Sequence, residues 1–95
     1  MSAAPTPGVV PGSPRLAYES AGSGPTVVFM HGIGGNRSNW REQLAALAPD
    51  FHALAWDARG YGDSEDYPED LAFPMFAADL LRLLDHLGVA QAHLV

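Results

Sequence analysis

Two short segments of this chain hold residue types that could do chemistry. The first is the sequence HGIGGN at residues 31–36, which follows an apolar run. Glycines allow the backbone to turn sharply and to approach a ligand closely, and N–H groups in such a turn can stabilise a developing oxyanion. The second is the sequence DARGYGDS at residues 57–64, which follows another apolar run. Its charged and hydroxyl side chains can either bind a ligand or brace the loop that carries them.

The glycine-rich segment has three interpretations. The first is a loop that supplies an N–H group to the oxyanion of an acyl-transfer reaction. The second is a dinucleotide-binding fingerprint, in which Gly32 and Gly34 begin the pattern, Arg37 occupies the third glycine position and Asp57 is a candidate ribose-binding acid. The third is an ordinary strand-to-helix turn. A Walker-type phosphate loop is excluded, because the chain contains no Gly-Lys-Ser/Thr sequence.

Ser64 is the only serine or threonine of the second segment. It lies in the sequence GDSED, which begins like the nucleophile pattern Gly-x-Ser-x-Gly but lacks the last glycine. A nucleophile elbow requires a strand, a sharp turn and a helix in immediate succession, and no helix is predicted directly after Ser64. We therefore expect Asp57, Arg59 and Ser64 to brace their own turn by hydrogen bonds and an ion pair.

The acidic and histidine residues do not form a metal-binding pattern. The five acids between residues 63 and 70 lack the alternate-position spacing, the central glycine and the final glutamate of a calcium loop. His52, His86 and His93 fall on separate predicted elements. We expect no metal ion and no other cofactor.

Predicted strands position both segments. The run from Thr26 to Met30 is short, continuous and rich in β-branched residues, which is typical of a strand buried on both faces. The run from Phe51 to Trp56 has the same character, and Ala92 to Val95 begins a third such strand. Ligand sites in open α/β sheets lie at the carboxyl ends of the strands, so both segments are expected to face one site.

Two helices are predicted between these strands. The first begins near Ser38 or Asn39, with Asn39 and Glu42 as a candidate capping pair, and Pro49 ends it. The second begins at Pro74, and Gly88 is placed to end it in a left-handed conformation. Each helix carries an apolar stripe. Polar residues of the second helix are expected on its opposite side, paired three positions apart: Asp79, Arg82 and Asp85.

The order of the predicted elements indicates an α/β fold. A strand–helix–strand–helix–strand succession forms a right-handed unit with a mostly parallel sheet and flanking helices. Residues 15–20 alternate weakly and predict an antiparallel strand before it. Residues 1–14 are expected to be a flexible Pro/Gly-rich arm, with a short strand near Val9 and Val10. Residues 15–95 are assigned to a single domain portion, because 95 residues are too few for two domains.

Composition narrows the classes of partner. The formal net charge is −6, with five arginines and no lysine, which argues against nucleic acid and against an anionic membrane surface. No apolar run approaches the roughly 20 residues of a membrane span, and the N-terminus lacks the pattern of a secretory signal. There is no cysteine, hence no disulfide. We expect a cytoplasmic protein with a small-molecule substrate, and the sequence does not predict its oligomeric state.

Taken together, the two segments resemble the N-terminal part of the α/β-hydrolase superfamily. That family has His-Gly-x-x-Gly after one strand and Asp-x-Arg-Gly-x-Gly-x-Ser after the next, and both patterns occur here in order and without a gap. The resemblance covers roughly residues 15–95. Within the superfamily it is nearest to enol-lactonase-like and esterase-like members.

The resemblance implies roles for particular residues. The backbone N–H of Ile33 would form half of the oxyanion hole, and Gly32 and Gly34 would line the substrate position. The remaining motif residues would be structural: His31, Asp57, Arg59, Gly60, Gly62 and Ser64.

The resemblance also places the nucleophile beyond this sequence. In the family, Gly-x-Ser-x-Gly follows the strand that begins here at Ala92, and the acid and the general-base histidine come later. We therefore expect a fold truncated before the nucleophile elbow and a chain that is inactive alone. The intact enzyme would cleave an ester, a lactone or a related bond through a Ser-His-acid triad without a cofactor.

Three other functions stay open. Epoxide hydrolases and dehalogenases share the second motif and use an Asp nucleophile, although they usually carry Pro where this chain has Gly34. A non-catalytic binding module on the same fold is another alternative. A nucleotide-dependent oxidoreductase is the third, since it would use the dinucleotide interpretation of the glycine loop.

Overall fold

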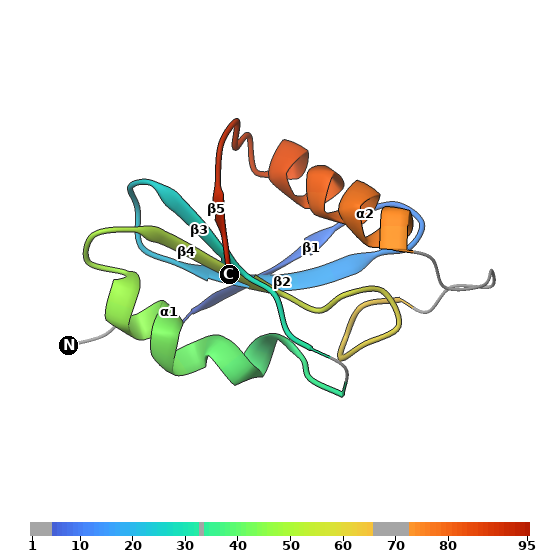
Figure 1. Cartoon of the computed structure of the whole chain (residues 1–95), viewed down its shortest axis with the longest axis horizontal. Coiled ribbons are helices and arrows are strands. Elements are labelled where there is room, and N and C mark those ends of the chain that lie inside the picture. The colour runs from blue at the N-terminus through green and yellow to red at the C-terminus, as the bar shows by residue number, and fades with distance from the viewer. Residues whose placement is uncertain (1–4, 33, 66–72) are drawn as a thin grey trace.

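The computed structural model describes residues 5–32, 34–65 and 73–95. In this part of the chain a five-stranded mixed sheet separates two helices, α1 (Arg41–Leu47) and α2 (Phe73–His86) (Figure 1). The strand order across the sheet is β1-β2-β4-β3-β5. The predicted α/β architecture is therefore confirmed.

The three later strands form the parallel half of the sheet. Strand β3 (Thr26–Phe29) pairs in parallel with β4 (His52–Trp56), with Thr26 opposite His52. On its other side β3 pairs in parallel with β5 (His93–Leu94). This is the succession predicted from the three apolar runs, and it brings the carboxyl ends of β3 and β4 together.

The two earlier strands form the antiparallel half. Strand β2 (Leu16–Ala21) pairs antiparallel with β4 and with β1 (Thr6–Val10). The strand expected near Val9 and Val10 is thus present and begins at Thr6. Residues 6–10 are therefore not part of the loose arm that we predicted. Pairing with β2 satisfies their backbone hydrogen-bonding groups, although their sequence is rich in Pro and Gly.

The core lies on both faces of the sheet. Side chains of a buried strand alternate between its two faces, and β3 shows this clearly: Val28 joins the cluster under α2, whereas Val27 and Phe29 join the cluster under α1. Leu83 of α2 and Leu44 of α1 are the fully buried helix residues in these clusters. The two helices therefore cover opposite faces, as the connection rule for parallel strands requires.

The start of the first helix differs from the prediction. A 3₁₀ turn, Arg37–Trp40, precedes α1, and the capping residue is Asn36. The Asn36 side chain accepts from the Ser38 N–H at 2.9 Å, and the Asn36 N–H donates to Asn39 Oδ1 at 2.7 Å. The predicted Asn39–Glu42 pair was wrong, because the first helical turn begins directly after Asn36, whose extended backbone makes it the capping residue.

In the described residues the second helix begins at Phe73, one residue before the predicted Pro74, and it ends as predicted. Pro74 lies in its first turn, and Gly88 has φ +68° after its last residue. The Val89 N–H donates to the Leu84 carbonyl at 2.9 Å and the Gly88 N–H to the Asp85 carbonyl at 3.1 Å, which is a Schellman ending. Neither α2 nor any other helix in the described ranges has the length and apolarity that a membrane crossing needs.

Candidate active site

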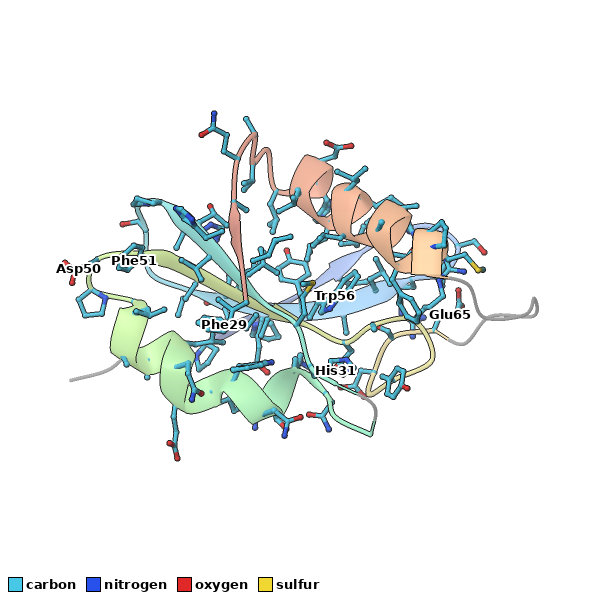
Figure 2. The ribbon with its side chains drawn as sticks, in the orientation of Figure 1. Phe29, His31, Asp50, Phe51, Trp56 and Glu65 are labelled. Carbon is cyan, nitrogen blue, oxygen red and sulfur yellow. The ribbon has the colours of Figure 1, made fainter. Side chains whose placement is uncertain are left out.

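The two motif segments lie side by side at the carboxyl edge of the parallel strands. Residues 31–36, called here the glycine loop, follow β3, and residues 57–65, called here the acidic turn, follow β4. Figure 2 shows His31 and Trp56 at this edge, where the two strands end. The parallel pairing of β3 with β4 therefore creates the juxtaposition that the sequence predicted.

His31 connects the two segments. The Ala58 N–H donates to His31 Nε2 at 3.0 Å, and His31 Nδ1 lies 2.9 Å from the Gly32 carbonyl oxygen. A backbone N–H can only donate, so Nε2 is the acceptor and the proton of the neutral ring lies on Nδ1. The ring also lies 5.0 Å from that of Tyr61, measured between centroids. With both nitrogens engaged, the imidazole holds the glycine loop against the acidic turn.

The glycines of the loop have different surroundings. A Cβ atom at Gly32 or Gly34 would meet none of the described residues within 4 Å apart from its neighbours in the chain, and Gly34 has φ +80°. A Cβ at Gly35 would lie 2.8 Å from Asn39 Oδ1 and 3.0 Å from the His31 Cβ. Gly35 is therefore packed into the protein, whereas Gly32 and Gly34 face open space. Ile33, the predicted oxyanion residue, lies outside the described residues.

Asp57 is the buried centre of the acidic turn. Its carboxylate is fully buried and accepts from the Arg37 N–H at 2.6 Å and from the Asp63 N–H at 2.9 Å. The Arg37 guanidinium contacts the same carboxylate. Gly62 approaches it so closely that an added Cβ would lie 2.4 Å from the Asp57 carboxyl carbon. A buried carboxylate needs such donors, since an isolated one would be very costly.

Arg37 is bound by three acids. Besides Asp57, its guanidinium contacts Asp63 Oδ2 at 2.8 Å and Glu19 Oε1 of β2 at 3.2 Å. Burial opposes the charge and by itself would lower the pKa of Arg37, but the hydrogen bonds to Asp63 and Asp57 and their charges outweigh it and raise the pKa. The guanidinium is therefore positively charged at every pH at which the protein would be studied.

Arg59 points away from this cluster. It forms a two-point ion pair with Asp79 of α2, with Nε at 2.6 Å from Oδ2 and Nη2 at 2.8 Å from Oδ1. Both side chains are buried. We predicted an ion pair within the turn. Instead, both residues pair with partners outside the turn: Asp57 with Arg37, and Arg59 with Asp79.

Ser64 has the bracing contacts expected of it. Its hydroxyl donates to the Asp57 carbonyl at 2.5 Å and accepts from the Ala17 N–H of β2 at 2.8 Å. Both hydrogen bonds are buried, and no helix follows this residue directly in the described part of the chain. This geometry is that of a structural serine.

The sequence analysis missed Arg37 and Asp79 as members of the site's framework. We considered Arg37 only as the residue at the third glycine position of the dinucleotide-binding fingerprint. We considered Asp79 only as a partner of Arg82 on the polar side of the second helix. The Arg82–Asp79 contact exists at 3.2 Å, but Asp79 is buried. One signal was available: Asp79 lies three residues after Phe76 and four before Leu83, on the apolar stripe itself.

Among the pockets that border the glycine loop, two are lined by both His31 and Gly32. One, of about 390 Å³, also includes Gly34, Asn39 and Trp40. The other, of about 370 Å³, lies towards α2 and is largely apolar, with Trp56 and Phe76 among its walls. A reacting group held here would be within reach of the glycine loop from either side.

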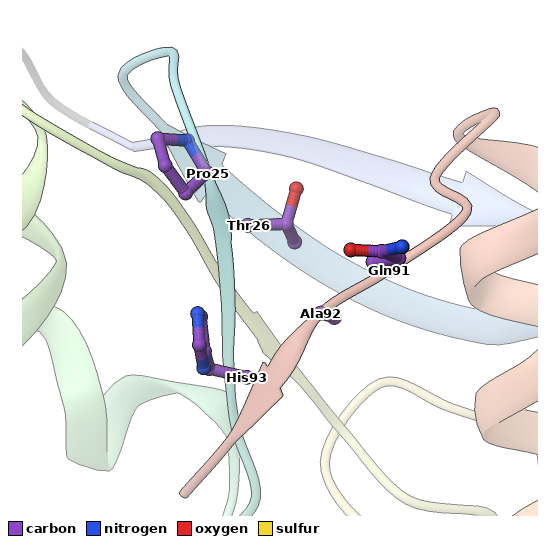
Figure 3. A pocket seen from close by; sticks show the side chains of 5 residues that line it. All are labelled: Pro25, Thr26, Gln91, Ala92 and His93. Carbon is purple, nitrogen blue, oxygen red and sulfur yellow. The ribbon is translucent and has the colours of Figure 1, made fainter.

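A further pocket lies at the opposite edge of the sheet. It has a volume of about 200 Å³ and is lined by residues at the amino ends of β3 and β5 (Figure 3). Close to it, Thr26 Oγ1 and His52 Nδ1 are 3.0 Å apart. Its lining includes no residue of either motif segment, so we do not assign this pocket to the site. Among the described residues there is also no cluster of acids and histidines able to hold a metal ion.

Comparisons with known proteins agree with this geometry. The sequence model of the alpha/beta hydrolase fold family matches residues 25–95. The chain is 43% identical over 84 residues to an epoxide hydrolase of Siraitia grosvenorii, and the match covers 85% of this chain and 27% of that protein. It is 40% identical over 70 residues to a putative carbamate hydrolase of Pseudomonas savastanoi, with 73% and 27% covered.

A solved structure shows the same arrangement. The epoxide hydrolase VrEH1 from Vigna radiata superposes with a TM-score of 0.87 at 34% identity, over 95% of this chain and 31% of that one. The chain thus spans less than a third of the length of these relatives. The matched motifs, the parallel β3–β4–β5 connections and the superposition lead to one conclusion. This chain belongs to the α/β-hydrolase fold family.

Proposed function

We propose that this chain provides the oxyanion side of the active site of a hydrolase that needs no cofactor. The observation that carries the proposal is the contrast within the glycine loop. Gly32 and Gly34 face open space at the carboxyl edge of the parallel strands, while Gly35 is packed against His31 and Asn39. A loop that is anchored at one side and free of side chains at the other can admit a substrate close to its backbone.

The proposed chemistry places the Ile33 N–H beside the reacting oxygen. When a nucleophile attacks a carbonyl carbon, the oxygen acquires negative charge, and a fixed N–H donor stabilises it by roughly 3–4 kcal/mol. Gly32 and Gly34 would leave room for the substrate on either side of that donor. The nucleophile, its base and the second donor would come from the rest of the protein.

The other motif residues would fix this loop rather than touch the substrate. His31 would hold it through the Ala58 N–H, and Asp57 would hold it through Arg37. The remaining members would maintain the acidic turn: Arg59, Gly60, Gly62 and Ser64. Their contacts among the described residues support this division.

We propose an ester, a lactone or a related carbonyl compound as the substrate, with a serine nucleophile. Gly34 supports this, because it stands where epoxide hydrolases and dehalogenases usually have proline. The likeness to a putative carbamate hydrolase also supports a carbonyl substrate. An epoxide opened by an aspartate nucleophile is the second candidate, and the likeness to two epoxide hydrolases favours it.

Assays on the protein with the full length of its relatives distinguish these candidates. The purified protein would be assayed with p-nitrophenyl butyrate, a γ-lactone and styrene oxide in buffer containing EDTA and no nucleotide. We expect ester or lactone turnover together with covalent labelling by a fluorophosphonate probe, which reacts with an activated serine. Turnover of styrene oxide alone, without labelling, would establish the epoxide candidate. No turnover of any of the three would favour a binding module.

A further inference from the structure

We propose that Arg37 is a positioning residue that sets the geometry of the glycine loop from its C-terminal side. The inference rests on the proposed function in one respect: the loop is taken to be the oxyanion side of the site. Arg37 itself touches no predicted reacting group. It acts through the loop residues that precede it.

Arg37 binds Asp57 with both its backbone and its side chain. The Arg37 N–H donates to Asp57 Oδ1 at 2.6 Å, and the guanidinium contacts Oδ2 of the same carboxylate. This two-oxygen contact fixes the position of the residue and the orientation of its peptide plane. Because Arg37 directly follows Asn36, the end of the glycine loop is fixed with it.

The guanidinium also joins two separate segments. It contacts Glu19 of β2 and both Asp57 and Asp63 of the acidic turn. The Glu19 and Asp57 side chains are only 5% and 0% exposed. Buried contacts of this kind are poorly screened by solvent, and the planar guanidinium can serve several acceptors that a lysine ammonium could not reach together.

Among the described residues, the loop has few other attachments at this end. The Gly35 N–H donates to the Gly32 carbonyl at 3.0 Å, and the Asn36 N–H donates to Asn39 Oδ1 at 2.7 Å. Both bonds lie within residues 32–39 and do not connect the loop to the sheet. At its start the loop is held by His31 and Ala58, and Arg37 provides the corresponding anchor at its end.

Arg41 offers a matched control. It also contacts Glu19, at 3.3 Å, but its side chain is 58% exposed, and no contact with Asp57 or with the glycine loop is recorded for it among the described residues. Replacing either arginine by methionine removes one positive charge near the same carboxylate and keeps most of the aliphatic stem. Only the Arg37 change removes the guanidinium contact with Asp57, and the Arg37 N–H bond to that carboxylate is then the only part of the anchor left.

The test uses the full-length protein with Arg37→Met, Arg37→Lys and Arg41→Met. Hydrogen–deuterium exchange is followed by mass spectrometry in peptides that contain Gly35 and Asn36 and in peptides from β4. We expect Arg37→Met to accelerate exchange of the loop peptide by about tenfold or more while β4 stays protected, which is the pattern of local opening. Arg41→Met should leave both peptides unchanged, and Arg37→Lys should lie between.

The same variants are assayed on whichever substrate the wild-type protein turns over. A displaced oxyanion donor weakens transition-state binding, so Arg37→Met should lower kcat by about tenfold or more, with KM changed less than about threefold. Equal effects of Arg37→Met and Arg41→Met would overturn the proposal, as would an unchanged loop peptide. A wild-type protein without turnover would refute the proposed function, and the exchange data would still decide the role of Arg37.

A milder variant covers the case in which Arg37→Met does not fold. Asp63→Asn removes one charged contact of Arg37 while keeping the Asp63 N–H bond to Asp57, and the Asp63 side chain is 74% exposed. We expect a smaller acceleration of the same loop peptide, in the direction of Arg37→Met. An unchanged loop peptide in this variant, with Arg37→Lys also unchanged, would overturn the proposal.

Discussion

At the scale of single residues, both ring nitrogens of His31 have hydrogen-bond partners, and the partner of Nε2 allows a test of what such a bond contributes to stability. His31→Leu removes the acceptor of the Ala58 N–H, and Ala58 is buried. A buried donor left without a partner costs about 1–3 kcal/mol. We therefore expect urea denaturation of the full-length protein to show a free energy of unfolding lower by about that amount.

The control for this change is His86→Leu. His86 lies exposed at the end of α2 and contacts Tyr18 only by a ring-edge approach of 6.2 Å. Its replacement should alter the free energy of unfolding by less than about 0.5 kcal/mol. Equal losses for the two histidines would show that the bond to Ala58 contributes little.

Comparing Gly62 with Gly88 distinguishes the stability cost of a left-handed backbone conformation from that of a steric clash. Both have positive φ, +52° and +68°. A Cβ at Gly88 would meet nothing within 4 Å, whereas one at Gly62 would lie 2.4 Å from the Asp57 carboxylate. Gly88→Ala should cost about 1–2 kcal/mol for the left-handed conformation, and Gly62→Ala should cost about 1–3 kcal/mol more, because the carboxylate must move. Thermal unfolding of the two variants measures the difference, and similar costs would contradict this account.

At the scale of elements, the Arg59–Asp79 ion pair connects the end of β4 to α2. Breaking a buried pair leaves a buried charge without its counter-charge and costs about 3–5 kcal/mol. We expect Asp79→Ala to lower the free energy of unfolding by that amount, measured by chemical denaturation. Asp85→Ala, an exposed change on the same helix, should have little effect.

A double substitution tests whether the charges of Arg59 and Asp79 or the shapes of their side chains stabilise the fold. Arg59→Met combined with Asp79→Leu removes both charges and keeps the branched shape of the side chain at position 79, so part of the stability lost in Asp79→Ala should return. If the double variant is as unstable as the single one, other contacts of Arg59 must carry the connection. Stability is again read from the denaturation midpoint and slope.

The elements themselves could largely be predicted, and the exceptions have physical causes. The apolar runs that became β3 and β4 and the glycine that ends α2 are local signals, since side-chain alternation and left-handed φ depend on nearby residues only. β1 was foreseen only in part, because its strand depends on pairing with β2. The cap of the first helix was misplaced by three residues, because the exact end of a glycine turn has no distinct signal in the sequence.

At the scale of the whole chain, β1 and β5 form the two edges of the sheet in the described residues. The edge of β5 that faces away from β3 pairs with no other strand in the described part of the chain, and Leu94 and Val95 are exposed. Exposed strand edges with apolar side chains favour association between chains. We expect residues 1–95 alone to aggregate or to unfold without cooperativity, unlike the full-length protein. Size-exclusion chromatography and a denaturation curve test this, and a soluble monomer with a cooperative transition would contradict it.

The sequence by itself determined the order of strands and helices and the position of the two motif segments after β3 and β4. Apolar periodicity, glycine and proline act locally, so one sequence was enough. Which charged side chains pair with one another depends on how the chain folds in three dimensions. Asp57 pairs with Arg37 and Arg59 with Asp79, each across 20 positions of sequence. Every acid in the sequence is an equivalent candidate for every arginine, and only the register of the sheet and the packing of α2 bring particular pairs within contact distance.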